Sequence, residues 1–133
     1  MELVSIGTVS SPLTHRDDAP KQGDEGAPEA WLEIADEVAD GLEGIVEGEE
    51  LLVFTWLDRA ERDVLRVNPR NDPSRGIQGV FSTRSPDRPN PIGLHRVTVL
   101  EIDGTRLRVS GLEALDGTPI VDLKPLLRSI EER

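Results

Sequence analysis

The sequence contains no cysteine and only two histidines, His15 and His95. The absence of cysteine excludes disulfides, thiolate metal ligands and a cysteine nucleophile. Two histidines are also too few for a zinc site built mainly from that residue. No glycine-rich phosphate-binding loop of the Walker or Rossmann type is present. We therefore expect no metal centre and no nucleotide-binding loop of either type.

Aromatic residues and long apolar runs are also scarce. Only four of the 133 residues are aromatic, so the core has to be built from valine, leucine and isoleucine. No apolar run approaches the roughly 20 residues that a membrane-spanning helix requires, and the N-terminal stretch MELVSIGTV does not resemble a secretory signal. These features predict a cytoplasmic protein with no membrane partner, in which residues 1–133 form one domain.

Acidic residues outnumber basic ones, and the formal net charge is -11 at pH 7. The charge is unevenly distributed, because residues 17–50 contain thirteen acids and one lysine, whereas residues 59–96 contain eight arginines and four acids. The net charge argues against a protein that coats nucleic acid non-specifically. The arginine-rich region has two interpretations: its side chains form surface ion pairs, or they form a face that binds an anion.

Short runs of β-branched and alternating residues, bounded by turn-forming residues, predict a mainly β protein. Strands are expected at residues 3–9, 50–58, 63–68, 79–84, 95–102, 105–112 and 119–123. Asp103-Gly104 and Asp116-Gly117 predict tight turns, the first of them within a hairpin. Many short strands in a small domain favour a single antiparallel β-barrel or sandwich with long polar loops. The barrel is the interpretation that we adopt.

The segment AWLEIADEVADGL, residues 30–42, is ambiguous. Its apolar residues follow a helical stripe, but its first part, residues 31–34, also fits a short strand. We favour a strand followed by an irregular or one-turn segment that ends at Gly41.

The stretch RSPDRPNPIG, residues 84–93, contains three prolines within six residues. Each proline fixes its own φ, removes a backbone donor and favours an extended conformation of the residue before it. The stretch is therefore predicted to be a stiff loop that is neither a helix nor a central strand. Because the prolines donate no hydrogen bond, Arg84, Arg88 and Asn90 remain as the donors that orient a bound molecule.

Two longer stretches resemble the signature blocks of the TsaA-like family, also called the TrmO family: GVFSTRSPDRPNPIGLHRV (79–97) and LEALDGTPIVDLKP (112–125). Shorter matches are IGTVSSP, PKQG and DGLEGI, so the resemblance extends over nearly the whole chain. It implies a β-barrel methyltransferase that uses S-adenosylmethionine. The best-known activity of the family is N-methylation of N6-threonylcarbamoyladenosine in tRNA, by a homodimer whose cofactor sites lie near the subunit interface.

The resemblance also implies which residues bind the cofactor. The family's contact positions correspond in this chain to Gln22, Gly23, Leu57, Asp58, Arg84, Leu94, Leu115, Asp116, Gly117 and Thr118. Arg84 would bind the cofactor carboxylate or stack on adenine, and Leu94 would form an apolar wall. Arg84 and Asp116 each have an alternative, purely structural role. Arg84 can form an ion pair, and the Asp116 side chain can bond nearby backbone.

The substrate-binding and catalytic residues are less closely specified. Arg88 and Asn90 are expected to contact the substrate, and Asn90, Asp122 and Lys124 are the candidates for a catalytic role. The alternative to a catalytic role for Asp122 and Lys124 is an ion pair between the two within the protein. His95 is expected to be a structural strand residue, because no triad or ligand set is visible beside it in the sequence.

The chain also departs from the family pattern. The stretch GEELLVFTWLD, residues 48–58, ends in Asp58, where many members have a histidine. No additional C-terminal domain like that of the longer bacterial enzymes is expected. Three functions therefore remain open: methylation of tRNA bound through the arginines of residues 59–96, methylation of a small metabolite, and a non-catalytic regulatory module that binds S-adenosylmethionine.

Overall fold

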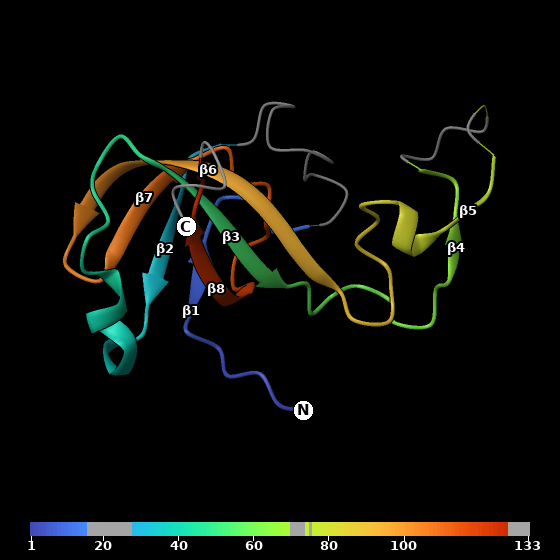
Figure 1. The fold of residues 1–133 in the computed structure, drawn as a ribbon, viewed down its shortest axis with the longest axis horizontal. Coiled ribbons are helices and arrows are strands. Elements are labelled where there is room, and N and C mark those ends of the chain that lie inside the picture. The colour runs from blue at the N-terminus through green and yellow to red at the C-terminus, as the bar shows by residue number, and fades with distance from the viewer. Residues whose placement is uncertain (16–27, 70–73, 75, 128–133) are drawn as a thin grey trace.

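The computed structural model describes residues 1–15, 28–69, 74 and 76–127. Six antiparallel strands form a closed barrel in the order β1-β2-β7-β6-β3-β8 (Figure 1). These strands are β1 (Gly7–Ser10), β2 (Ala30–Ile34), β3 (Glu50–Trp56), β6 (Ile92–Asp103), β7 (Arg106–Ser110) and β8 (Pro119–Pro125). The prediction of a mainly β protein built on a small antiparallel barrel is confirmed.

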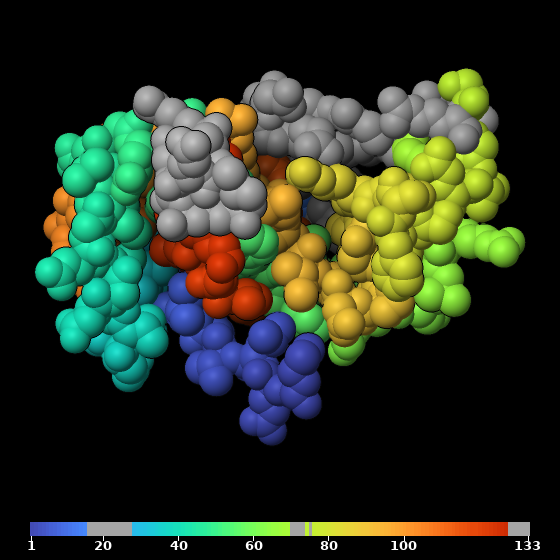
Figure 2. Space-filling view, in the orientation of Figure 1, coloured from blue at the N-terminus to red at the C-terminus, as the bar shows by residue number. Residues whose placement is uncertain are grey.

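A two-stranded sheet lies outside the barrel. Its strands are β4 (Arg66–Val67) and β5 (Gln78–Gly79), and the short 3-10 helix η6 (Val80–Ser82) follows directly. Together with the proline-rich loop, these elements project from the barrel beyond the end of β3 and the start of β6 (Figure 1). We call this projection the arm, and it comprises residues 64–91 as far as they are described. Figure 2 shows its surface, yellow-green to gold, on one side of the molecule.

The expected strand at residues 79–84 is wrong for most of its length, because the chain turns into η6 after Gly79. The reason is local hydrogen bonding to the carbonyl oxygen of Val80. This oxygen accepts from the Thr83 backbone N–H at 3.0 Å, from the Thr83 hydroxyl at 2.9 Å and from the Arg88 guanidinium at 2.7 Å. Donors from the following loop therefore take the place of a partner strand.

Other elements follow the sequence more closely. Residues 30–42 form β2 and then the 3-10 helix η3 (Asp36–Leu42), so the strand followed by a short turn-like segment is confirmed. The β6–β7 hairpin is also present, but its two loop residues are Gly104 and Thr105, one position later than predicted. Gly104 has a φ of 62°, which glycine adopts without steric cost.

The proline-rich loop has no regular structure from residue 84 to residue 91, as the sequence predicts. The last two residues of the predicted loop, Ile92 and Gly93, were wrongly predicted, because they pair with Trp56 and Thr55 and β6 begins at Ile92 instead of residue 95. Four predicted strands, β1, β3, β4 and β7, are shorter than expected. β1 begins at Gly7 instead of residue 3, and β4 contains only two residues. Among the described residues, we find no helix with the length and apolar character needed to cross a membrane.

The core fills the inside of the barrel with aliphatic side chains. Alternate residues of each strand point inward, which buries Val53 in β3, Val97 and Val99 in β6, and Leu107 in β7. Only three polar side chains of the described residues are buried: Thr55, His95 and Thr118.

Candidate cofactor and substrate site

One outer face of the barrel brings together three of the predicted site residues. Phe54 in β3 pairs with Leu94 in β6 on one side and with Asp122 in β8 on the other. Lys124 lies two residues further along β8, and therefore on the same face. Leu94 and Phe54 are half-buried, whereas Asp122 and Lys124 are exposed. The resulting face has an apolar middle and a polar edge.

Asp122 and Lys124 also form the ion pair that was their alternative role. The Lys124 Nζ lies 3.9 Å from the Asp122 Oδ2, and both side chains are more than half exposed. Such an exposed pair contributes about 0 to 1 kcal/mol to stability. Both side chains remain within reach of a bound molecule, and their catalytic role stays a prediction.

The end of β3 is tied to two of the other predicted segments. The Leu57 backbone N–H donates to the Pro91 carbonyl at 2.8 Å, which joins the end of β3 to the proline-rich loop. Arg59 donates to the Thr14 carbonyl at 2.7 Å and to the Asp116 carbonyl at 3.3 Å. Arg59 was not singled out from the sequence, although its position directly after the predicted pair Leu57–Asp58 could have indicated it.

The turn at residues 115–118 is held from both sides. Backbone N–H groups of Asp116 and Gly117 donate to the carbonyls of Leu13 and Val9, both at 2.7 Å. The Thr118 hydroxyl closes the turn by donating to the Leu115 carbonyl at 2.7 Å. Leu115 and Thr118 are buried, so the exposed residues of this predicted segment are Asp116 and Gly117.

The Asp116 side chain has a structural role in this turn. Its Oδ1 accepts a hydrogen bond from the Ser11 backbone N–H at 3.0 Å. This is the backbone-bonding alternative, although the partner lies on another segment instead of within the turn. The other carboxylate oxygen has no hydrogen bond to the described part of the chain and can still face a ligand.

Arg84 is exposed and makes no hydrogen bond or ion pair with the described part of the chain. Its structural alternative, an ion pair with an acidic neighbour, is therefore not observed there. Gln22 and Gly23 lie outside the described residues.

Arg88 differs from Arg84 although both belong to the same loop. Its guanidinium and Nε donate to the carbonyls of Ser85 (2.7 Å), Val80 (2.7 Å) and Thr83 (2.5 Å). These bonds give Arg88 a structural role in the loop that the sequence analysis did not foresee. A substrate contact by Arg88 stays a prediction, and it would have to use the donors that remain.

Asn90 belongs to a small polar and aromatic cluster. Arg62 lies over the Trp56 ring, 5.1 Å from its centroid, and donates to the Pro89 carbonyl at 2.7 Å and to the Asn90 Oδ1 at 3.1 Å. The cluster lines a surface hollow of about 430 Å³ together with Ile92 and the N-terminal segment. With its oxygen occupied by Arg62, the Asn90 side chain presents its amide N–H groups as donors.

His95 is buried between two polar partners, which the sequence analysis did not expect. Its Nε2 lies 2.7 Å from the Thr55 Oγ1, and its Nδ1 lies 2.6 Å from the Glu113 Oε1. Thr55 is fully buried, His95 is 4% exposed and the Glu113 side chain is 17% exposed. The three residues form a chain of hydrogen bonds from the interior to the surface.

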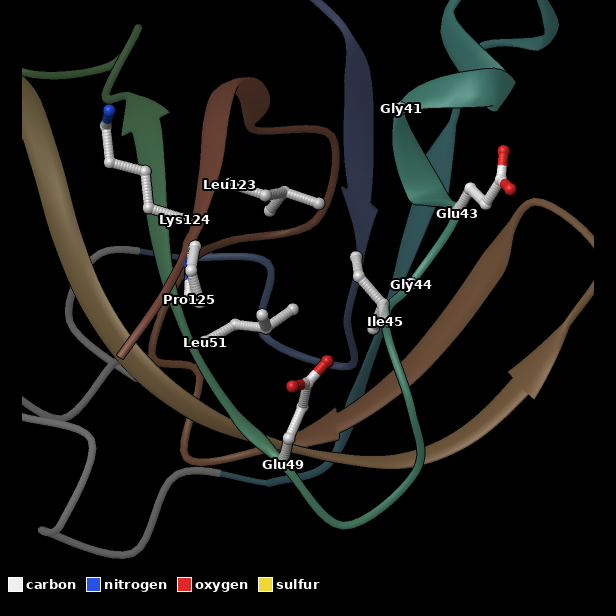
Figure 3. Close-up of a pocket in the computed structure, with 9 residues that line it drawn as sticks. All are labelled: Gly41, Glu43, Gly44, Ile45, Glu49, Leu51, Leu123, Lys124 and Pro125. Atoms are coloured by element: carbon white, nitrogen blue, oxygen red, sulfur yellow. The ribbon is translucent and has the colours of Figure 1, made fainter. Parts of the chain in front are cut away.

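A second hollow, of about 290 Å³, lies where residues 41–49 pass the end of β8 (Figure 3). Leu51, Leu123 and Ile45 form its apolar lining, whereas the Lys124 ammonium points away from it. Of the predicted site residues, only Lys124 borders this hollow, so we place the candidate site at the end of β3 instead.

Most of the described arginines of residues 59–96 form no ion pair with a described acid. Within the described residues, only Arg96 pairs with an acid, Glu50. The hydrogen bond from Arg96, and then its charge, lower the pKa of Glu50, and the same contact raises the pKa of Arg96. Arg59 and Arg88 donate to carbonyl oxygens, and Arg66, like Arg84, has no partner there. A neutral carbonyl oxygen satisfies the hydrogen-bond donors of a guanidinium but does not offset its positive charge.

The closed barrel, its proline-stiffened arm and the segments joined at the end of β3 agree with the class of β-barrel methyltransferase domains that the sequence resemblance implies. A family model supports this assignment, because the model described as the tRNA-methyltransferase O N-terminal domain matches residues 8–132. The chain belongs to that family.

Curated relatives show the same relationship. The chain is 47% identical over 124 residues to an S-adenosyl-L-methionine-binding protein of Archaeoglobus fulgidus, covering 93% of this chain and 88% of the relative. It is also 47% identical over 126 residues to a probable S-adenosyl-L-methionine-binding protein of Methanothermobacter thermautotrophicus, covering 95% and 90%. The family prediction is confirmed, and S-adenosylmethionine, the predicted cofactor, is the molecule for which these relatives are named.

Solved structures support the fold. A crystal structure of TrmO from Pseudomonas aeruginosa superposes with a TM-score of 0.76 at 26% identity, over 100% of this chain. The chain spans 60% of the length of that solved chain. The individual cofactor contacts remain predictions from the sequence.

Proposed function

We propose that this protein transfers the methyl group of S-adenosylmethionine to N6-threonylcarbamoyladenosine in tRNA. One observation carries the proposal: hydrogen bonds join the end of β3 to the proline-rich loop and to the turn at residues 115–118, next to an arm whose described arginines form no ion pair with an acid of the described residues. The first part supports a methyltransferase, and the second supports a polyanionic substrate.

The residues at the candidate site fit the chemistry of S-adenosylmethionine. Leu94 and Phe54 offer an apolar wall of the kind that adenine packs against. Asp58 offers an exposed carboxylate as an acceptor for ammonium or ribose hydroxyl groups, and Arg84 offers an exposed guanidinium for a carboxylate. When bound, S-adenosylmethionine supplies an electrophilic methyl group on a sulfonium.

The chain's own contribution to this reaction is mainly positioning. Because the methyl group is already activated, alignment with the nucleophile and exclusion of water supply most of the rate enhancement. Arg88 stiffens the loop next to Arg84 by its three carbonyl contacts, so the loop does not need to order on binding. Asp122, on the same face as Leu94, is the available base if the acceptor nitrogen has to lose a proton.

Cells that lack the gene are expected to lack methylated threonylcarbamoyladenosine in their tRNA, and the nucleoside composition of that tRNA is the measurement. Restoring the gene should restore the methylated nucleoside. An unchanged content in cells with no redundant enzyme would overturn the tRNA assignment. Methylation of a small molecule, with weak dependence on ionic strength, would then favour the metabolite alternative. Cofactor binding without any methylated product would favour the regulatory module.

The same proposal can be tested with purified protein through salt dependence. If two to four phosphates of tRNA are contacted, the logarithm of the tRNA affinity should fall with the logarithm of the salt concentration with a slope of about -1.4 to -3.6. Arg66→Ala should reduce this slope by about 0.7 to 0.9, the value of one contact. Arg106→Ala is the matched control, because Arg106 lies outside the arm, pairs with Glu33 and stacks on Trp31.

We also propose that the protein is a homodimer and that the arm lies in its interface. Large apolar side chains of the arm are unusually exposed: Leu65 at 63%, Ile77 at 64% and Phe81 at 81%. Exposed apolar groups gathered on one projection mark an interaction surface. A small core also gains stability from apolar area buried between two copies.

Phe81→Asp is therefore expected to shift the protein from dimer to monomer at micromolar concentration, because it places a charge in the apolar surface of the arm. Sedimentation should find about twice 14.6 kDa for the wild type and about 14.6 kDa for the variant. Val46→Asp is the matched control, since Val46 is 58% exposed and lies outside the arm. A wild type that sediments only as a monomer would contradict the proposal.

A further inference from the structure

We propose that Thr55, His95 and Glu113 form a positioning chain that holds the cofactor-binding segments in register, so that affinity for S-adenosylmethionine depends on hydrogen bonds inside the barrel. This inference rests on the proposed function, because the segments concerned are those predicted to bind the cofactor. None of the three residues was predicted to be a site residue, and Thr55 and His95 are buried.

The placement of the three residues is the first argument. Thr55 belongs to β3 and lies two residues before Leu57, and His95 belongs to β6 and directly follows Leu94. Glu113 lies in the connection between β7 and β8, two residues before the turn at residues 115–118. The chain thus joins three separate segments, each at most two residues from a predicted cofactor contact.

The chemistry of the chain defines the direction of its hydrogen bonds. An ionised carboxylate only accepts, so the His95 Nδ1 carries a proton and donates to Glu113. In the neutral ring, Nε2 then accepts from the Thr55 hydroxyl at 2.7 Å. Linked hydrogen bonds in a low-dielectric interior polarise one another, which makes the arrangement stiffer than two independent bonds.

Gly93 supplies an independent observation. A Cβ atom at this position would lie 2.4 Å from the Thr55 Oγ1 and 2.8 Å from the His95 Nε2. Glycine weakens a strand interior, and it often marks a place where another group approaches closely. Here the space that a side chain would fill is taken by the hydrogen bond between Thr55 and His95.

A purely structural role does not need polar groups at this place. The surrounding core is aliphatic, and replacing a buried hydrogen-bonded pair by apolar residues of similar shape is often neutral or stabilising. What an apolar replacement cannot supply is a fixed direction and distance between three segments. Cofactor binding is the property of this end of the barrel that requires such precision.

The test compares isosteric variants of Thr55. Thr55→Val keeps the shape but leaves the His95 Nε2 without its donor, and we expect the Kd for S-adenosylmethionine in calorimetry to rise about tenfold. Thr55→Ser restores the hydroxyl and should bind within about twofold of wild type. Val109→Ala is the control, because Val109 is fully buried in β7 and has no part in the chain.

Two outcomes would overturn the proposal. One is a folded Thr55→Val protein with the wild-type Kd. The other is a Val109→Ala protein that loses as much affinity as Thr55→Val at a similar melting temperature, because general loosening of the core would then explain the effect.

Nitrogen NMR of the imidazole ring gives a readout that a merely structural role would not move. The chain contains two histidines, so His15→Gln leaves His95 as the source of every imidazole signal. We expect a ring protonated at Nδ1, and a change of the Nε2 resonance on saturation with S-adenosylmethionine. An unchanged Nε2 resonance in a protein that binds the cofactor would contradict the proposal. A wild type that does not bind the cofactor at all would instead contradict the proposed function.

Discussion

Arg84→Ala is expected to weaken S-adenosylmethionine binding roughly 10- to 100-fold, because a charge-assisted hydrogen bond contributes about 1.5 to 3 kcal/mol. Arg84 is exposed and its guanidinium has no partner within the described residues. It also sits in a loop stiffened by Pro86, Pro89 and the carbonyl contacts of Arg88. Little conformational entropy is then lost when Arg84 binds a carboxylate. Calorimetry with the cofactor measures the effect.

Arg66→Ala is the matched control for this prediction. Arg66 is also an exposed arginine of the arm without a partner in the described part of the chain, so its loss removes the same charge. Arg62 is less suitable, because it stacks on Trp56 and holds Asn90. The melting temperature should be unchanged in both alanine variants. Equal dissociation constants for the two variants would remove Arg84 from the cofactor site.

Gly93→Ala is expected to destabilise the fold by about 2 to 6 kcal/mol, since overpacking costs about 1 to 3 kcal/mol and a displaced buried hydrogen bond costs about as much again. The new Cβ would meet the Thr55 Oγ1 at 2.4 Å and the His95 Nε2 at 2.8 Å. Thr55 and His95 are both buried, so neither side chain can move into solvent. The free energy of unfolding in urea measures the loss.

Gly41→Ala is the control for a glycine that has room. A Cβ at Gly41 would meet nothing within 4 Å, and Gly41 lies in the exposed helix η3. This variant should have wild-type stability or slightly more. A Gly93→Ala protein as stable as Gly41→Ala would mean that the interior yields more easily than the close contacts indicate.

Much of the barrel was predictable because strand patterns are local. Alternation of inward and outward residues identified β3, β6 and β7, and turn residues marked the hairpin between the last two. The main error, the strand expected at residues 79–84, arose because Thr83 and Arg88 side chains bond the Val80 carbonyl. The strand propensities of single residues do not show that side chains will compete with a partner strand for a backbone carbonyl.

The candidate site was predictable to a lesser degree. Family resemblance indicated Leu94 and residues 115–118, and the strand register places Phe54 between Leu94 and Asp122. Family resemblance did not distinguish the roles of Arg84 and Arg88, since the two are the same residue type in the same loop. Their different roles depend on which guanidinium lies within 3 Å of three carbonyl oxygens, and only the folded loop determines that.

Local sequence alone specified a mainly β protein, the stiff loop at residues 84–91 and the membership of a methyltransferase family, because each depends on neighbouring residues or on a contiguous motif. The chain of Thr55, His95 and Glu113 depended on the tertiary fold. His95 is 40 residues from Thr55 and 18 residues from Glu113, and no periodicity relates such positions. The folded barrel brings the His95 ring nitrogens within 3 Å of the Thr55 and Glu113 oxygens. The pairing of β3 with β6 directs the Thr55 and His95 side chains into the barrel interior.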